Sequence, residues 1–381
     1  MVLSSPTHIS LVAGTGNLDY TEYPRSNPGG SRGRLGAAGA SGTRKGNHCR
    51  MMKLRTMVRG LEGDAAAKAA ASLWDHDANS LAFFRASANF VYVMRRAGET
   101  VFLRFGSAAE TDAGRLAAEL DFIEYLGRHG YPAAQPITSR GGNRFETVHT
   151  EQGCYHAAVF EKAPGTRLDR CRLSEADVEA YGRSLADLHE LSRSYKPSGG
   201  IVWRSWLDAL AFVRDVLRDH PEETDAAAER DAVRAWLQGL PAEEDGYGLV
   251  HYDFERDNVF LDENSRQFAV IDFQDAMLHW YSMDAAGTLE DLDDAGTGEA
   301  FDGKAAFLRG YEAVRGPGAA NRALLPKLRR FSALYGFARV LRALEGSGGL
   351  DKDKAPPWYE GLRGKLAASL ERDRAGFREP W

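Results

Sequence analysis

The chain has few cysteines and no long apolar run. Only three of its 381 residues are cysteine, and Cys49, Cys154 and Cys171 are widely spaced in no metal-ligand pattern. A disulfide framework or a zinc site is therefore not expected. No apolar stretch approaches the roughly 18 residues that cross a bilayer, and the N-terminus lacks the basic-then-apolar order of a secretory signal. These absences predict a cytoplasmic protein with no membrane partner.

Positive charge is not in excess either. There are 48 lysine and arginine residues against 54 aspartate and glutamate residues, so the net charge is -6 and the pI is near 6.0. A dedicated nucleic-acid-binding domain is usually basic. We therefore expect no nucleic-acid partner. The chain is long enough for two lobes, and 43% hydrophobic residues is enough to form their cores.

Large apolar residues are scarce near the N-terminus. Residues 26–46 are mostly Gly, Ser, Ala and Arg, and such a segment cannot bury enough surface to offset its chain entropy. We expect residues 1–62 to be a disordered or mis-assigned extension, with the functional chain starting at Met51 or Met52. An Arg-rich organelle transit peptide is the alternative.

Residues 63–162 predict a small lobe built on an antiparallel sheet. An alanine-rich helix is expected near 64–74, and apolar residues recur at helical spacing over 113–128, before a stop at Gly130. That second helix would cross the sheet. The expected strands are 81–84, 90–94, 100–105, 145–148 and 155–160.

Residues 163–381 predict a larger, mainly helical lobe. It begins after Pro164 and Gly165, which interrupt regular structure. The fold class is therefore α+β. The expected helices are 175–191, 206–217, 226–237, 305–314, 326–344 and 358–372.

Three oxygen-bearing side chains stand at an informative spacing. Residues 259–271 hold two short apolar runs around a turn-rich centre near Ser265, which predicts a β-hairpin. Asn258 and Asp272 flank this hairpin, and as cross-strand neighbours their Cβ atoms would lie roughly 5 Å apart. Mg²⁺ is usually held by one or two protein oxygens plus substrate phosphates. Asp253 lies on the preceding loop, where its carboxylate can reach a substrate hydroxyl.

The order of these residues matches a kinase pattern. His-x-Asp, four residues, Asn, and then Asp-Phe after a hairpin is typical of catalytic and metal-binding loops in which the first Asp accepts the hydroxyl proton. Residues 251–284 resemble the aminoglycoside phosphotransferase and choline kinase-like family, which includes homoserine kinase-type and stress response kinase-type proteins. The resemblance implies a protein-kinase-like bilobal fold, ATP and Mg²⁺ as cofactors, Asp253 as catalytic base, and Asn258 and Asp272 as metal ligands.

The resemblance also implies a cation–carboxylate pair in the small lobe. Arg104 ends an expected strand and Glu119 lies on the following helix, where the pair would position the nucleotide phosphates. Glu110 and Glu124 are the alternatives to Glu119. Many family members place Lys at the position of Arg104, and Arg differs because it is a planar fork rather than a compact point charge.

Two further segments correspond to nucleotide contacts in the family. Residues 85–89 stand where a phosphate-covering loop would lie, although this loop has no glycine. The backbone N–H groups of Ser87 and Asn89 are the expected phosphate donors. Phe160 and Glu161 resemble the hinge between lobes, whose backbone groups would hydrogen-bond the adenine edge.

The rest of the loop has mixed expectations. His251 is expected to brace the loop rather than to act as a base. Asp284 resembles the family Asp that ties the catalytic loop down. Glu255 occupies a position where protein kinases favour a cation, and Arg256 either compensates for it or faces solvent.

The phosphate acceptor is the least specified element. Acidic residues within 290–299 could line a pocket for an amine, with Trp280 or Tyr281 as a cation–π face. The alternative is that the acids form a solvated loop and the aromatics pack the core. The sequence predicts ATP- and Mg²⁺-dependent transfer of phosphate to a hydroxyl of a small molecule, by a monomer or homodimer. A stress-response-type protein Ser/Thr kinase and a catalytically silent nucleotide-binding module are the alternative functions.

Overall fold

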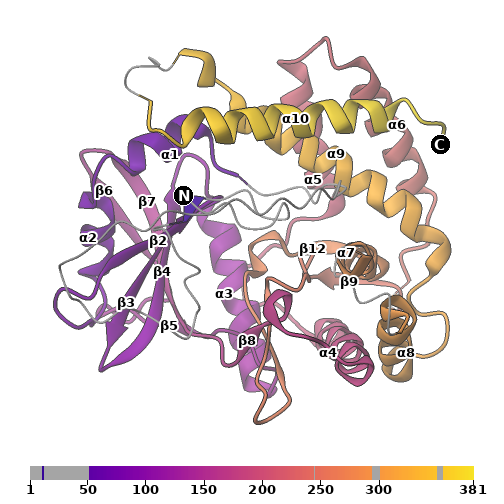
Figure 1. Cartoon of the computed structure of the whole chain (residues 1–381), viewed down its shortest axis with the longest axis horizontal. Helices are drawn as coiled ribbons and strands as arrows, with labels where there is room; N and C mark the ends of the chain where they lie inside the picture. Colours follow the sequence, from indigo (N-terminus) through magenta and orange to yellow (C-terminus); the bar gives the residue numbers. More distant parts are fainter. Residues whose placement is uncertain (1–10, 13–50, 244, 294–300, 350–354) are drawn as a thin grey trace, which may run out of the picture.

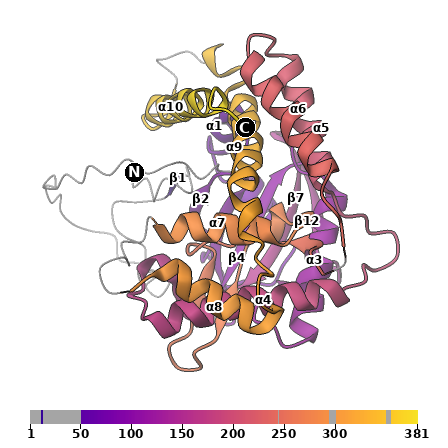
Figure 2. The same cartoon turned by 90° about the vertical axis from the view of Figure 1, so that its right-hand side faces the viewer.

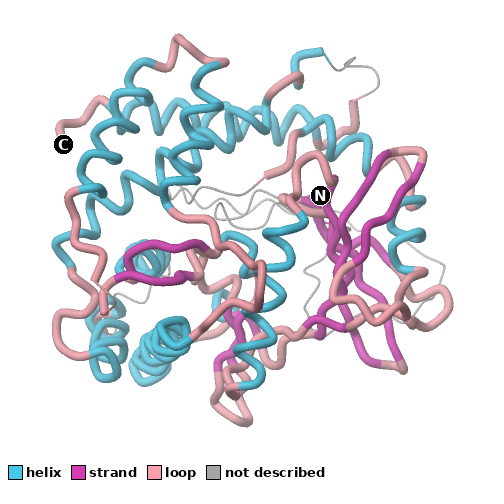
Figure 3. The backbone as a smooth tube through the Cα atoms, turned by 180° about the vertical axis from the view of Figure 1, so that it is seen from behind, coloured by secondary structure: helices cyan, strands magenta, loops and turns pink. Residues whose placement is uncertain are grey.

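Two lobes of different composition make up the structure (Figure 1). Strands gather at one end and helices at the other, with short strand pairs inside the helical lobe (Figure 3). This arrangement confirms the expected bilobal α+β fold. Most of the expected N-terminal extension lies outside the described residues. The computed structural model describes residues 11–12, 51–243, 245–293, 301–349 and 355–381.

The small lobe is built on a seven-stranded antiparallel sheet. Its order is β1-β2-β3-β4-β7-β5, and β6 also pairs with β7. Alternation along β4 buries Val101, Leu103 and Phe105 on one face of the sheet. The strands are β1 (Leu11–Val12), β2 (Ala82–Ala86), β3 (Phe90–Arg96), β4 (Glu99–Ser107), β5 (Pro136–Ile137), β6 (Glu146–Thr150) and β7 (Gly153–Glu161).

Helix α3 (Ala113–Arg128) has the bounds that the sequence predicts. Asp112 caps it, because its side chain accepts a hydrogen bond from the backbone N–H of Arg115 at 2.9 Å. Apolar residues at helical spacing, including Leu120 and Ile123, are buried. The helix runs between the sheet and the large lobe (Figure 1). It therefore presents its side chains to both lobes.

Residues 51–60 pack into the core, although the sequence assigns them to the N-terminal extension. Met51 and Met52 are buried, and they lead into helix α1 (Leu54–Gly60), which buries Leu54 and Met57. Gly60 allows a close approach, since a Cβ at this position would collide with the ring of Phe90. The packed small lobe thus starts before the expected boundary at residue 62. Helix α2 (Ala65–Ala71) follows near the expected position.

The large lobe is mainly helical. Helices α4 and α8 lie side by side with α7 beside them (Figure 2), and glycines allow the close packing, because a Cβ at Gly182 or Gly310 would meet the backbone of the other helix. No helix among the described residues is both long and apolar enough to cross a membrane. The helices are α4 (Glu175–Ser194), α5 (Trp206–Arg218), α6 (Thr224–Gln238), α7 (Ser282–Asp293), α8 (Gly303–Arg315), α9 (Leu325–Leu344) and α10 (Tyr359–Phe377).

Short strands carry the loops of interest. Strand β10 pairs with both β8 and β11, and β9 pairs with β12, all antiparallel. The sequence predicts only the β10–β11 hairpin among these. The strands are β8 (Thr166–Arg167), β9 (Tyr247–Val250), β10 (Val259–Leu261), β11 (Phe268–Val270) and β12 (Met277–Trp280), and 3₁₀ turns occur at η1 (Leu168–Arg170), η2 (Phe273–Asp275), η4 (Arg322–Leu324) and η5 (Ser347–Gly349).

The register of the β10–β11 hairpin differs from the expected one by one residue. The backbone N–H of Asp262 donates to the carbonyl of Gln267 at 3.0 Å, so the turn is centred between residues 264 and 265. Asn258 therefore lies opposite Ile271, whose N–H donates to the Asn258 carbonyl at 3.0 Å. The expected approximate pairing of Asn258 with Asp272 is thus offset by one residue. Asp272 lies one residue beyond the pairing.

Candidate active site

Asp253 and Asn258 are held together on the loop between β9 and β10. The Nδ2 of Asn258 donates to the Oδ2 of Asp253 at 2.9 Å and to its backbone carbonyl at 3.1 Å. A five-residue loop is thus closed by one amide. The contact fixes the direction of the Asp253 carboxylate and leaves the other end of the amide free to face a ligand.

Asp272 enters the site through an unusual backbone conformation. Its φ of 66° and ψ of 59° lie in the left-handed region, which Asp adopts more readily than most residues. This turn directs the chain away from β11, and the carboxylate meets two cations. Arg104 Nη1 lies 3.4 Å from its Oδ1, and Arg85 Nη2 lies 3.7 Å from its Oδ2.

The oxygen chemistry of the site fits a hard divalent cation. The Oδ1 of Asn258 is buried and has no hydrogen-bond partner. An unpaired buried carbonyl oxygen is costly, and a cation ligated by it would remove that cost. Asp272 supplies a carboxylate at the cavity wall. One amide oxygen and one carboxylate are the kind of protein ligands that Mg²⁺ uses beside substrate phosphates.

His251 is a brace, as the sequence predicts. Its Nδ1 accepts a hydrogen bond from the backbone N–H of Asp253 at 3.2 Å, so its proton is on Nε2, which donates to the carbonyl of Ile271 at 3.0 Å. Burial lowers the pKa of His251, despite the opposing effect of nearby Asp284. The neutral ring thus connects the catalytic loop to the segment that carries Asp272.

Asp284 ties down the same loop from the first turn of α7. Its Oδ2 accepts from the backbone N–H of His251 at 2.8 Å and from His189 Nε2 at 2.9 Å, and its Oδ1 accepts from the backbone N–H of Tyr252 at 2.6 Å. Tyr252 has a positive φ of 73°, which a strong local tether helps to maintain. The expected structural role of Asp284 is confirmed.

Arg104 pairs with Glu119, not with either alternative acid. Both guanidinium ends contact the carboxylate, with Nη1–Oε1 at 2.9 Å and Nη2–Oε2 at 2.6 Å. Burial by itself would lower the pKa of Arg104, but the Glu119 carboxylate outweighs it and raises the pKa above the usual value. Glu110 instead contacts Arg342, and Glu124 lies 3.5 Å from an Nη1 of Arg144.

A cavity opens between the lobes beside these groups. Its volume is about 630 Å³, including space that is open to solvent. The hinge residues Phe160 and Glu161 form part of its wall, and the backbone N–H of Glu161 donates to the carbonyl of Gln135 at 2.8 Å. The lining residues are Arg85, Val91, Phe102, Arg104, Ile123, Ala134, Phe160, Glu161, Ala163, Phe260, Ile271, Asp272 and Phe273.

The loop between β2 and β3 differs from expectation. Ser87 and Asn89 are buried and do not line the cavity. The N–H of Ser87 donates to the carbonyl of Asn89 at 3.1 Å, and the side chain of Asn89 donates to Gln274 Oε1 at 2.5 Å. Arg85 lines the cavity instead. Sequence reasoning missed it, although a cation in a phosphate loop without glycine was a signal for it.

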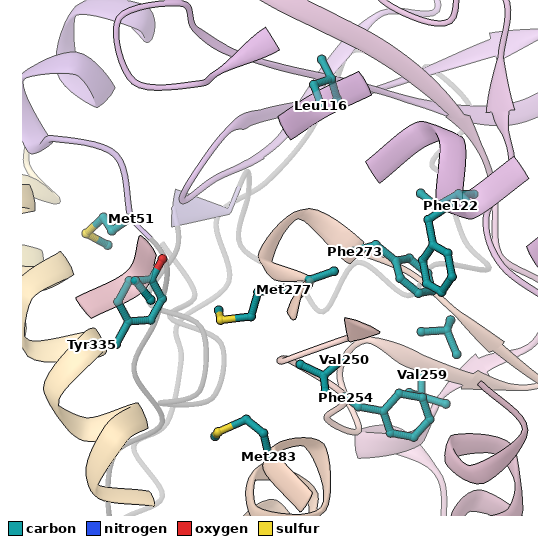
Figure 4. Close-up of a cluster of buried hydrophobic side chains, with 14 of the residues drawn as sticks. Met51, Leu116, Phe122, Val250, Phe254, Val259, Phe273, Met277, Met283 and Tyr335 are labelled. Atoms are coloured by element: carbon teal, nitrogen blue, oxygen red, sulfur yellow. The ribbon is translucent and has the colours of Figure 1, made fainter. Parts of the chain in front are cut away.

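Phe122 and Phe273 belong to the hydrophobic cluster in Figure 4. Phe273, next to Asp272, packs edge-on against Phe122 of α3 with ring centroids 5.8 Å apart, and against His251 at 4.5 Å. The position of the metal-side loop thus depends on α3. The same helix carries Glu119, the partner of Arg104, so two cavity-lining residues, Arg104 and Phe273, contact side chains of α3.

The expected amine pocket does not form from the residues that the structure describes there. Trp280 and Tyr281 are buried and pack the core, which was the alternative interpretation. Asp291 is buried too, and its Oδ2 accepts from Arg256 Nε at 2.9 Å and from the Arg256 backbone N–H at 3.0 Å. Arg256 therefore neither compensates for Glu255 nor faces solvent. Residues 294–300 lie outside the described residues.

Several proteins of similar sequence are named as kinases. The amicoumacin kinase of Bacillus subtilis (strain 168) is 26% identical over 218 residues, which are 56% of this chain and 64% of that protein. The chain thus spans just under two thirds of this relative. The homoserine kinase of Caulobacter sp. (strain K31) is 29% identical over 249 residues, which are 63% of this chain and 74% of that protein.

Solved structures share the fold. An amicoumacin kinase in complex with AMP-PNP, Ca²⁺ and Ami has a TM-score of 0.69 at 21% identity, covering 86% of this chain and 96% of that one. A microcompartment-associated aminopropanol kinase has a TM-score of 0.58 at 24% identity, covering 82% and 97%. The expected kinase-like architecture is thereby confirmed. A model of the phosphotransferase enzyme family matches residues 80–319, more than half of the chain, and the chain therefore belongs to this family.

Proposed function

We propose that the protein transfers the γ-phosphate of ATP to a hydroxyl group of a small molecule. The observation that carries this proposal is the 2.9 Å contact between Asn258 Nδ2 and Asp253 Oδ2, beside a cavity whose wall includes Asp272 and Arg104. One loop thus presents a proton acceptor and a cation ligand together. Family membership and the small-molecule kinases among the relatives support the same reaction class.

Asp253 is the proposed proton acceptor. Both ring nitrogens of the neighbouring His251 are already bonded to backbone groups, so that side chain has no free basic position. The contact with Asn258 directs the Asp253 carboxylate, which would accept the proton of the acceptor hydroxyl. The new bond joins that hydroxyl oxygen to the γ-phosphorus, the bond to the β-phosphate oxygen breaks, and the proton passes to Asp253. Orientation of the hydroxyl is its main contribution.

Asn258 and Asp272 are the proposed ligands of Mg²⁺. The unpaired Oδ1 of Asn258 supports this assignment, as does the Asp272 carboxylate at the cavity wall. When bound, the cation supplies charge neutralisation for the β- and γ-phosphates. A structural neighbour is a complex with AMP-PNP and Ca²⁺, which supports a nucleotide and a divalent cation in this fold. The Arg104–Glu119 pair would hold the opposite wall.

The proposed acceptor is a small molecule rather than a protein. Relatives are named for amicoumacin, homoserine and aminopropanol, and no contact in the described residues favours a protein substrate. The silent-module alternative is also disfavoured, because a chain without catalysis has no need to keep the Asp253–Asn258 contact beside Asp272.

The test is an isosteric change of the proposed proton acceptor. We expect Asp253→Asn to lower turnover by about 10²- to 10⁴-fold, the usual contribution of general acid–base groups. Pooled amino alcohols, hydroxy amino acids and aminoglycosides serve as acceptors, with Mg²⁺ and labelled ATP. Asp231→Asn, an exposed change on α6, is the control. Equal turnover of Asp253→Asn and wild type would remove Asp253 from the mechanism.

A further inference from the structure

We infer that Arg85 is a phosphate-binding cation of the small lobe, in place of a glycine-rich loop. This inference rests on the proposed function. It assigns the triphosphate to a residue on β2 that the kinase-like pattern does not single out. Four observations lead to it: the donors of Arg104, the loop backbone, a β-bulge and the contact with Asp272.

Most donors of Arg104 are already committed. Its two Nη atoms bind Glu119 at 2.9 and 2.6 Å, and Nη1 also lies 3.4 Å from Asp272. The ring of Phe160 covers the guanidinium, with Cζ 4.7 Å from the ring centroid. An Arg has five N–H donors in a fixed plane, so a bidentate pair restricts where the others point. Arg104 is therefore held in place by Glu119 and Asp272, and few of its donors remain for a triphosphate.

The loop after β2 offers little from its backbone. Residues 85–89 contain no glycine, and the N–H of Ser87 is used within the loop by the carbonyl of Asn89. A phosphate cradle made of backbone N–H groups needs several such donors pointing outward. Because the Ser87 N–H is already bonded, this loop has one backbone donor fewer for a phosphate oxygen. We therefore expect a side-chain donor to make that contact.

A β-bulge places Arg85 on the cavity side of the sheet. Phe83 pairs with Tyr92, but Arg85 pairs with Val91, so the register shifts between these two positions. With unbroken pairing, Arg85 would oppose Phe90, which is fully buried in the core. The bulge moves it opposite Val91, which lines the cavity. Bulges commonly re-aim a side chain next to an active site.

The contact of Arg85 is with the proposed metal ligand. Its Nη2 lies 3.7 Å from Asp272 Oδ2, which is longer than a hydrogen bond, and its side chain is 14% exposed. With the cation bound, Asp272 would turn to ligation, and Arg85 would exchange this weak contact for phosphate oxygens. A guanidinium binds a phosphate through two parallel N–H donors, which is the strongest form of this contact.

Nucleotide binding tests this inference without any turnover. We expect Arg85→Gln to weaken the binding of ATP and ADP by tenfold or more, as for a lost charge-assisted hydrogen bond, and to leave adenosine binding unchanged. Arg85→Lys should restore part of the affinity because it keeps the charge. Isothermal titration calorimetry on the full chain, with and without Mg²⁺, gives the dissociation constants. Arg96→Gln, an exposed position at the end of β3, is the control.

The outcomes separate this inference from the proposed function. If wild type and Arg85→Gln bind ATP equally, Arg85 is not the phosphate-binding cation and the kinase proposal stands. If adenosine weakens as much as ATP, the effect lies in the cavity wall and overturns the inference. If wild type binds no ATP in Mg²⁺, both proposals fail. Unchanged circular dichroism and thermal midpoint would show that the variants are folded.

Discussion

The role of a side chain in this site can often be inferred from which of its polar atoms already have hydrogen-bond partners. Asn258 uses its Nδ2 for Asp253 and leaves its Oδ1 without a partner, so one amide would join the proposed proton acceptor to the proposed cation. His251 shows the opposite case, since both of its nitrogens are bonded and it cannot serve as a base. The spacing of these residues was visible in the sequence, but their bonded atoms were not.

Buried histidines predict how stability depends on pH. Burial lowers the pKa of His189 and His251, and it lowers the pKa of His279 from 6.5 to about 3. The unfolded chain takes up protons as the pH falls below about 6.5, whereas the folded histidines stay neutral. Stability contributed by the neutral rings is therefore present above pH 6.5 and is lost as the pH falls toward 3. Within this window each such histidine lowers the free energy of unfolding by up to about 1.4 kcal/mol for each unit by which the pH falls.

Urea unfolding at pH 7.5, 6.5 and 5.5 checks this expectation. The free energy of unfolding should fall on acidification, and His279→Asn should reduce the slope, since Asn keeps an acceptor for the Trp280 backbone N–H. His149→Asn, an exposed position on β6, should leave the slope unchanged. A free energy that stays flat from pH 7.5 to 5.5 would contradict the assignment of these rings as neutral.

Helices and strands differ in how far the sequence specified them. Helix α3 has the predicted bounds because its apolar spacing, its Asp112 cap and the Gly130 stop agree with one another. Helix α1 was missed because it is short and Lys53 at its start provides no side-chain cap. Strands β9 and β12 pair with each other across almost thirty residues, and such a pairing has no local signal.

The candidate site was predictable to a similar extent. Motif spacing singled out Asp253, Asn258 and Asp272. In the structure Asn258 bonds to Asp253 and pairs with Ile271, the residue before Asp272, and Asp272 lines the cavity. The one-residue difference in hairpin register arose because turn composition does not fix which two residues are central. Arg85 was visible as a cation in a loop without glycine, but its direction could not be predicted, since strand alternation alone would point it into the core and only the bulge reverses this.

Helix α7 leads to a prediction about one element. Its first turn carries Asp284, which holds two backbone N–H groups of the catalytic loop and His189 of α4. We expect Asp284→Asn to lower the free energy of unfolding by about 2–4 kcal/mol, because charge-assisted bonds to buried donors are weakened. It should also lower kcat with little change in the KM for ATP, since Asp253 loses its orientation while the nucleotide cavity is intact.

Denaturation and steady-state kinetics on the same variant test both parts. Glu290→Gln, a part-exposed change on the same helix, is the matched control. It should change the free energy of unfolding by no more than about 0.5 kcal/mol and leave kcat unchanged. If Asp284→Asn raised the KM for ATP and kept kcat, the tether would act on the nucleotide cavity, and its role in orienting Asp253 would be refuted.

The two lobes also meet away from the cavity, near the start of helix α1. Glu110, between β4 and α3, accepts from the backbone N–H of Lys53 at 3.0 Å and from Arg342 of α9 at 2.9 Å. Lys53 Nζ in turn lies 2.6 Å from Glu345 Oε2. Helix α10 runs across the same side of the molecule, from the side of α1 to that of α6 (Figures 1 and 2). Lys53, at the start of α1, thus contacts both Glu110 of the small lobe and Glu345 after α9.

The ion pair between Glu110 and Arg342 should contribute to the free energy of unfolding, because both side chains are partly buried. The side chains of Glu110 and Arg342 are 11% and 27% exposed, so solvent screens their attraction less than it screens an exposed pair. In a double-mutant cycle with Glu110→Ala and Arg342→Ala, we expect a coupling of about 1 kcal/mol in the free energy of unfolding. The exposed pair of Glu360 and Arg363 on α10 should give at most about 0.5 kcal/mol. A coupling for Glu110 and Arg342 no larger than that of the exposed pair would contradict the expected effect of burial on this ion pair.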